Sequence, residues 1–151
     1  MNAALEIHNW HGAGYCPLVF SDDWQLALLN WEPSFSLENL GEIERHVASE
    51  EVFVLVHGRA LLFVFDAAGQ LASSDMQPGV VHNVLRGSWH NLLATPDASW
   101  VIVEKRDTHL HDTHLRQMVT EERQALLERL PSWASLTVSG SQRASRGAAC
   151  C

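Results

Sequence analysis

The sequence predicts an all-β domain, a small barrel or sandwich, followed by one helix. From Val52 onward, short runs of β-branched and aromatic residues alternate with turn signals such as Gly58-Arg59 and Gln77-Pro-Gly79. Turns repeated about every eight to twelve residues are typical of all-β barrels and sandwiches. With 151 residues, of which 46% are hydrophobic and 19% charged, the chain has the size and composition of one domain with one core.

The barrel is expected over about residues 20–105. Residues 1–23 show no steady period and predict an extended arm with turns. Residues 24–31 alternate two largely apolar faces, which indicates a strand covered on both sides. The remaining strands are predicted at 52–56, 60–65, 71–74, 80–84, 89–93 and 100–104.

The chain changes character after the last strand. Thr120, followed by two acids, predicts a helix N-cap, and a stripe of leucines after it predicts a helix over about 120–130 that docks outside the barrel. Ser, Gly, Ala and Arg then dominate, which predicts a disordered tail over 139–151. We therefore expect a single domain over 1–138.

Composition argues against several partners. The formal net charge is −8, and no run of Lys or Arg is present to neutralise phosphates, which argues against nucleic acid and anionic membranes. The chain has no apolar run of about 18 residues and no signal-peptide pattern at its N-terminus, so we expect a cytoplasmic protein. Cys16, Cys150 and Cys151 form no disulfide framework.

Two stretches carry side chains that suit a metal ion. Side chains alternate faces along an extended chain, so Glu44 and His46 point the same way, with Glu51 following on the next predicted strand. The stretch 79–91 has the turn and strand character needed to bring His90 to the same place. Two histidines and a carboxylate suit Fe(II), Mn(II), Ni(II) or Zn(II) and leave positions open for water or substrate.

The same two stretches resemble the two sequence motifs of the cupins. In the first motif, Glu44 stands where cupins have the first His of a His-x-His pair. In the second motif, Leu85 stands where cupins have a Pro. The matching residues are His46, Glu51 and Gly58 in the first motif and Gly79, Gly87 and His90 in the second.

The resemblance covers about residues 24–104 and implies a double-stranded β-helix, or jelly-roll, barrel. It implies that Glu44, His46, Glu51 and His90 meet at the inner wall and hold a divalent ion, with Fe, Mn, Ni and Zn all open. Glu44 is then either a fourth ligand or a catalytic general base beside the ion. Without metal, His46 and Glu51 would pair with each other, because a buried carboxylate needs a partner.

The other histidines are not expected to bind this metal ion. His82 is expected in the barrel wall. His57 lies about six residues from the carboxylate ligand along one strand, roughly 20 Å away, and is too far to reach the same ion. His109, His111 and His114 form either a second metal site or a solvated loop, and the loop is favoured because no packed scaffold follows the last strand.

Two classes of function remain open. One is a metal-dependent enzyme acting on a sugar or a small organic acid, as do the isomerases, epimerases, lyases and dioxygenases among the cupins. The other is a non-catalytic small-molecule-binding protein or sensor. We also expect a homodimer, because an exposed first strand and an apolar N-terminal arm leave a sheet edge that natural proteins tend to cover.

Overall fold

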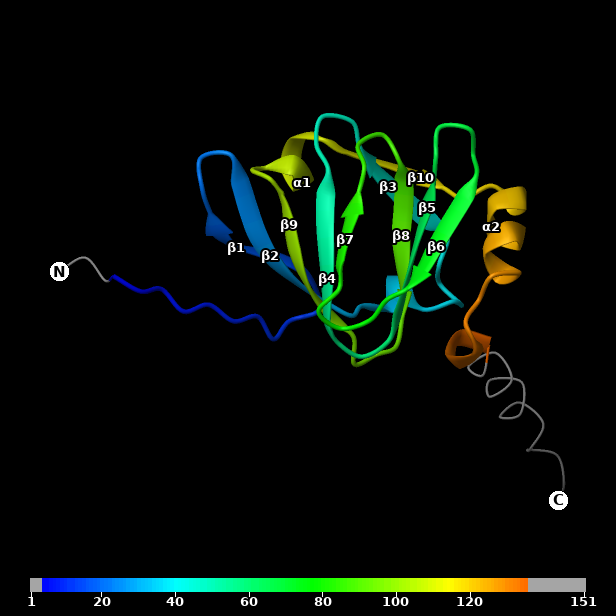
Figure 1. The fold of residues 1–151 in the computed structure, drawn as a ribbon, viewed down its shortest axis with the longest axis horizontal. Helices are drawn as coiled ribbons and strands as arrows, with labels where there is room; N and C mark the ends of the chain where they lie inside the picture. The colour runs from blue at the N-terminus through cyan, green and yellow to red at the C-terminus, as the bar shows by residue number, and fades with distance from the viewer. Residues whose placement is uncertain (1–3, 136–151) are drawn as a thin grey trace, which may run out of the picture.

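The computed structural model describes residues 4–135, which form two antiparallel five-stranded sheets (Figure 1). One sheet has the strand order β1-β2-β9-β4-β7 and the other has the order β10-β3-β8-β5-β6. The strands are β1 Gly14–Phe20, β2 Trp24–Asn30, β3 Glu42–His46, β4 Glu51–His57, β5 Ala60–Phe65, β6 Leu71–Asp75, β7 Val81–Val84, β8 Trp89–Ala94, β9 Ser99–Lys105 and β10 Thr113–Gln117.

The strand order is that of a jelly roll. From β2 to β9 the chain crosses from one sheet to the other at every connection except the β5–β6 hairpin, so β2-β9-β4-β7 forms one layer and β3-β8-β5-β6 the other. Strands β1 and β10 add one edge strand to each layer. Eight strands in two antiparallel sheets are the jelly-roll arrangement, and the predicted all-β fold is confirmed.

Inward-facing residues change from apolar to polar along the barrel. Phe53 and Leu55 on β4, and Trp100 and Ile102 on β9, are almost fully buried between the sheets. Apolar burial of this kind is the main favourable term for folding. At the end of the barrel where β4 begins and β9 ends, the inward positions are polar instead, and the candidate site lies there.

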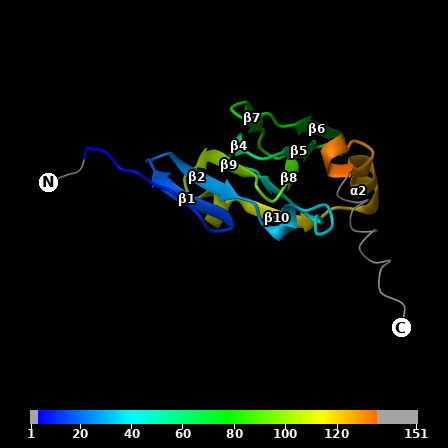
Figure 2. The same cartoon turned by 90° about the horizontal axis from the view of Figure 1, so that it is seen from below.

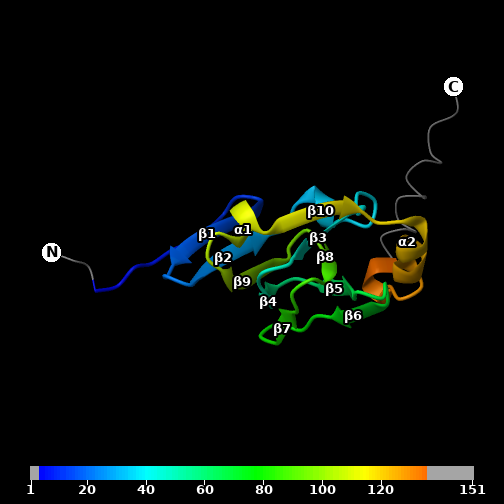
Figure 3. The ribbon, with the colours of Figure 1, turned by 90° about the horizontal axis from the view of Figure 1, so that it is seen from above.

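Helical segments flank the two sheets. The 3-10 turn η1 spans Pro33–Phe35, and the short helix α1, Thr108–His111, follows β9. Helix α2, Thr120–Leu127, packs outside the barrel beside β6, at the opposite end of the molecule from β1 and β2 (Figures 2 and 3). No helix among residues 4–135 is long and apolar enough to cross a membrane.

The predicted helix is correctly located but too long. It ends at Leu127, not Leu130, and Thr120 is its first helical residue, not its cap. The cap position is Val119, whose backbone N–H donates to the carboxylate of Glu122 at 3.0 Å. The Glu122 side chain therefore satisfies the backbone donor of the residue in the cap position.

Three sequence predictions about the strands need correction. Strand β1 begins at Gly14, inside the predicted arm, and β10 lies beyond the predicted end of the barrel at residue 105. Both are edge strands with mostly half-buried or exposed side chains, so their apolar alternation is weak. Strand β2 is covered on one face only, because Trp24, Leu26 and Leu28 on its outer face remain partly exposed.

Gly58 closes the turn between β4 and β5 for a steric reason. Its φ of +78° lies in the left-handed region, and a Cβ atom there would stand 2.6 Å from the Cα of Ala98. Only glycine fits both conditions. The predicted tail over 139–151 lies outside the described residues, and the domain limits of 1–138 stay a prediction.

Candidate metal centre

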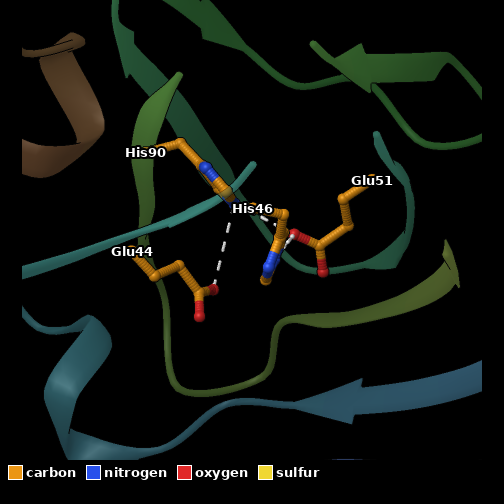
Figure 4. Close-up of side chains that lie close together, drawn as sticks. All are labelled: Glu44, His46, Glu51 and His90. Carbon is orange, nitrogen blue, oxygen red and sulfur yellow. Dashed lines mark hydrogen bonds and ion pairs between the residues drawn. The ribbon is translucent and has the colours of Figure 1, made fainter. Parts of the chain in front are cut away.

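The four predicted ligands come together at the polar end of the barrel. Glu44 and His46 project from β3, Glu51 from the start of β4 and His90 from β8 (Figure 4). One potential ligand atom of each lies within 4.8 Å of the other three. The strand register causes this convergence, since Glu44 pairs directly with His90 across β3 and β8. Their roles as metal ligands stay a prediction.

Glu51 is the centre of the cluster. Its Oε2 lies 2.9 Å from Nε2 of His90 and 3.1 Å from Nε2 of His46. All three side chains are at least nine-tenths buried. Glu44 is the outer member, with 35% of its side chain exposed and its Oε1 at 3.9 Å from Nε2 of His90.

Backbone carbonyls orient both imidazoles. Nδ1 of His46 donates to the carbonyl oxygen of Asp112, and Nδ1 of His90 donates to that of Ser88, each at 3.1 Å. Because a carbonyl oxygen only accepts, Nδ1 carries hydrogen in both rings, and a neutral ring then has a lone pair on Nε2. Two such lone pairs would face the Glu51 carboxylate. A cation, either a proton or a metal ion, is needed among these atoms, and the donor set therefore fits a divalent metal.

In the metal-free protein, protons supply this positive charge. Burial lowers the pKa of the His46 imidazole, but the hydrogen bond and charge of Glu51 outweigh burial and raise that pKa to about 9. The pKa of His90 is raised by the same balance. Burial would raise the pKa of Glu51, yet hydrogen bonds from both histidines hold it below its usual value. Metal binding would displace the imidazole protons.

Asp112 holds the turn between β3 and β4 in place. Its Oδ1 accepts the backbone N–H of Val47 at 3.0 Å, and its Oδ2 accepts that of Ala48 at 2.9 Å and the hydroxyl of Ser49 at 3.2 Å. The backbone N–H of Gly87 also donates to the carbonyl of His46 at 2.6 Å, which joins the two motif segments. These contacts set the direction of the ligand side chains, as outer hydrogen bonds do around metal sites.

A cavity of about 340 Å³ adjoins the cluster. This volume lies within the range of small-molecule sites. Besides the four candidate ligands, the cavity is lined by Tyr15, Leu29, Glu32, Ser34, Phe35, Asn39, Glu42, Ile43, Phe53, Asn91, Leu92, Glu104, His109, Thr113 and Leu115.

A second polar group lines the cavity beside Glu51. Gln25, Glu104 and Glu51 form one row across β2, β9 and β4, since each is the register partner of the next. The hydroxyl of Tyr15 donates to Oε1 of Glu104 in a short hydrogen bond, and Nε2 of Gln25 lies 2.8 Å from the same oxygen. Burial raises the pKa of both Tyr15 and Glu104.

The prediction that His109 lies in a solvated loop is wrong. It lies on helix α1, its ring packs 5.5 Å from that of Tyr15, centroid to centroid, and its Nδ1 contacts Nε2 of Gln25 at 2.8 Å. It also lines the cavity, whereas His111 and His114 are not among the lining residues. The sequence did not reveal these contacts of His109 with Tyr15 on β1 and Gln25 on β2.

The remaining histidines lie outside the site. His57 is exposed and its Nδ1 donates to the carbonyl of Asp97 at 2.9 Å. His82 is half-buried on β7, with Nε2 at 3.0 Å from the hydroxyl of Ser74 in the other sheet. Neither lines the cavity.

Sequence reasoning missed Tyr15, Gln25 and Glu104. Two of these had a usable signal. Gln25 shares a face with the apolar Ala27 and Leu29, and Glu104 shares a face with apolar residues of β9. A polar residue at an inward position of an apolar strand needs a buried partner, and so it marks a candidate site. Tyr15 had no such signal.

Comparisons with known proteins give similar structures but no sequence family. No family model matches the chain, and no curated protein matches it. Among solved structures, a cupin-2 domain containing protein from Shewanella frigidimarina NCIMB 400 is 24% identical, with a TM-score of 0.45 over 66% of this chain and 85% of that one.

Two enzymes also appear among the similar structures. Oxalate decarboxylase from Bacillus subtilis, which has Mn(II) centres, is 16% identical with a TM-score of 0.44, over 56% of this chain and 21% of its own. A chain from a study of two DMSP lyases is 20% identical with a TM-score of 0.45, over 66% of this chain and 46% of its own. This chain therefore matches less than half the length of either enzyme. Cupins are among the similar structures, as the motif resemblance implies.

Proposed function

We propose that this protein is a small metal-dependent enzyme in which His46, Glu51, His90 and Glu44 hold one divalent ion. The observation that supports this proposal is the meeting of two buried imidazole Nε2 atoms with one buried carboxylate oxygen, at 3.1 and 2.9 Å. Backbone carbonyls fix both rings in the tautomer that presents a lone pair, which is the form that binds metals. When bound, the ion supplies Lewis-acid polarisation of a carbonyl or hydroxyl group.

The chain's own residues supply orientation and proton transfer. His46, Glu51 and His90 are rigidly held and buried, whereas Glu44 is partly exposed at the cavity. Burial and the negative charge of Glu51 raise the pKa of Glu44 to about 7, which is near the value that favours a general base at neutral pH. Glu44 is thus the fourth ligand or the group that accepts a proton from the substrate.

Phe53 and Leu92 form an apolar part of the cavity wall beside this centre. The His90 ring packs edge-on against Phe53, with 5.8 Å between ring centroids. Apolar walls lower the local dielectric and strengthen electrostatic interactions with a bound molecule. The proposed substrate is a small polar metabolite in a cytoplasmic enzyme.

A non-catalytic binding protein or sensor is the second candidate. It is favoured by the ability of protons on His46 and His90 to satisfy Glu51 without any metal. In that case the cavity would hold its ligand by hydrogen bonds alone, and metal would be absent from the purified protein.

Metal analysis of protein purified without an affinity tag separates the candidates. We expect about one equivalent of a divalent metal in the wild type and in His82→Ala, whose ring lies outside the cavity, and loss of the metal in His90→Ala. A wild type that carries no metal, even after exposure to Fe(II), Mn(II), Ni(II) and Zn(II), would refute the enzyme proposal.

Glu44→Gln then separates the two roles of that side chain. If Glu44 is a ligand, the variant loses metal affinity. If Glu44 is the base, the variant keeps its metal and loses turnover.

A further inference from the structure

Several carboxylates line the cavity. Glu32, Glu42, Glu44, Glu51 and Glu104 line it, and none of the lining residues within 4–135 is Lys or Arg. A divalent ion held by Glu44 and Glu51 would be neutralised by those two carboxylates. A centre with His in place of Glu44 would instead keep one positive charge. The other three acids therefore remain without a cationic side chain in the cavity.

The His109 ring faces the amide of Gln25 and not the Glu104 carboxylate. The backbone N–H of Asp107 donates to Oε1 of Gln25 at 3.0 Å, which fixes the amide so that its NH₂ group faces His109. Because an amide nitrogen only donates, Nδ1 of His109 is placed as the acceptor of this contact.

Glu104 points independently to a bound donor. Its carboxylate is 5% exposed and lines the cavity, yet both of its hydrogen bonds, from Tyr15 and from Gln25, end on Oε1. No hydrogen bond within residues 4–135 reaches Oε2. Oε2 is therefore open to the cavity, and a cationic group there would form a charge-assisted hydrogen bond with it.

We propose that the site takes a small organic cation, such as an amino alcohol, whose ammonium group pairs with Glu104 while its hydroxyl group faces the metal centre. The metal-facing half of this inference rests on the proposed function. The same charges oppose a small organic acid, one of the two substrate classes that the sequence left open, because like charges in a confined cavity repel.

Ethanolamine and glycolate are suitable probes, since both are two-carbon hydroxyl compounds of opposite charge. Calorimetric titration of the Zn²⁺-loaded protein should show ethanolamine binding at least about tenfold more tightly than glycolate, because one close charge pair at an effective dielectric near 20 corresponds to more than a factor of ten in affinity. Tighter binding of glycolate, or binding of neither probe in the millimolar range, would overturn the proposal.

Glu104→Gln tests the residue itself. The new Oε1 can accept the same two hydrogen bonds from Tyr15 and Gln25, while an uncharged NH₂ group replaces Oε2. We expect the variant to keep its metal and lose the preference for ethanolamine. Glu121→Gln, which removes the same charge from an exposed position on α2, should keep that preference. An unchanged preference in Glu104→Gln would refute the assignment.

Glu42→Gln provides a second variant at an exposed cavity residue in case Glu104→Gln fails to fold. It should reduce the preference by a smaller factor, and no reduction would count against a role for cavity charge. The two proposals fail differently. Absence of metal from the wild type refutes the metal centre, whereas a metal-loaded protein that prefers glycolate refutes only the cation site.

Discussion

Raising the pH should destabilise the metal-free protein between about pH 6.5 and pH 9. The pKa of His46 is raised from 6.5 to about 9, so the folded state binds this proton more tightly than the unfolded state does. The contribution is complete below pH 6.5 and is lost as the pH rises through about 9. His90 has a raised pKa with the same main causes and therefore the same sign.

The magnitude follows from the His46 pKa. One pKa unit corresponds to about 1.4 kcal/mol, so the rise from 6.5 to about 9 is worth about 3 kcal/mol of unfolding free energy. Only 5% of the His46 side chain is exposed, so solvent screens this interaction little. Glu51, whose pKa is lowered, acts in the opposite direction but below its unfolded pKa of 4.5, outside this window.

Urea unfolding followed by tryptophan fluorescence, with a chelator present, measures this loss at pH 6.5, 7.5 and 9. Glu51→Gln should flatten the pH dependence because it removes the carboxylate that raises both imidazole pKa values. His57→Gln, at an exposed histidine, should leave the dependence unchanged. With a divalent metal bound, stability should instead rise with pH, since metal and protons compete. A metal-free wild type whose stability is constant or increases across the window would refute the reasoning.

Three further predictions concern the scaffold and the assembly. Gly58→Ala should lower the free energy of unfolding by at least about 1 kcal/mol more than Gly69→Ala does. Both glycines have positive φ, but only Gly58 lies against Ala98. Equal losses of free energy in urea unfolding would contradict this. Asp112→Ala should weaken metal affinity about 10- to 100-fold, because it frees the β3–β4 turn. Asp66→Ala frees the turn after β5 and should leave metal affinity unchanged. Metal titration of the two variants compares these effects. We also predict a homodimer, since Leu5 and Ile7 in the arm and Val81 on edge strand β7 are 74%, 87% and 66% exposed; a monomeric mass by light scattering at micromolar concentration would contradict it.

The sequence by itself determined the fold class and the members of the candidate metal cluster. Strand alternation has a period of two, so the spacing of Glu44 and His46 places both on one face wherever the strand is paired. Turn chemistry is equally local, and the positive φ at Gly58 and Gly87 agrees with the turns predicted at these positions. Such features depend on neighbours in the chain, and a single sequence contains them.

Only the tertiary structure decided what shares the cavity with that cluster. Tyr15, Gln25, Glu104 and His109 come from β1, β2, β9 and α1, and their contacts depend on the register between strands far apart in the chain. The edge strands β1 and β10 were unrecognised because solvent on one side weakens their apolar pattern. The charge of the cavity, and with it the kind of molecule it favours, follows from side chains that meet only after the two sheets have packed.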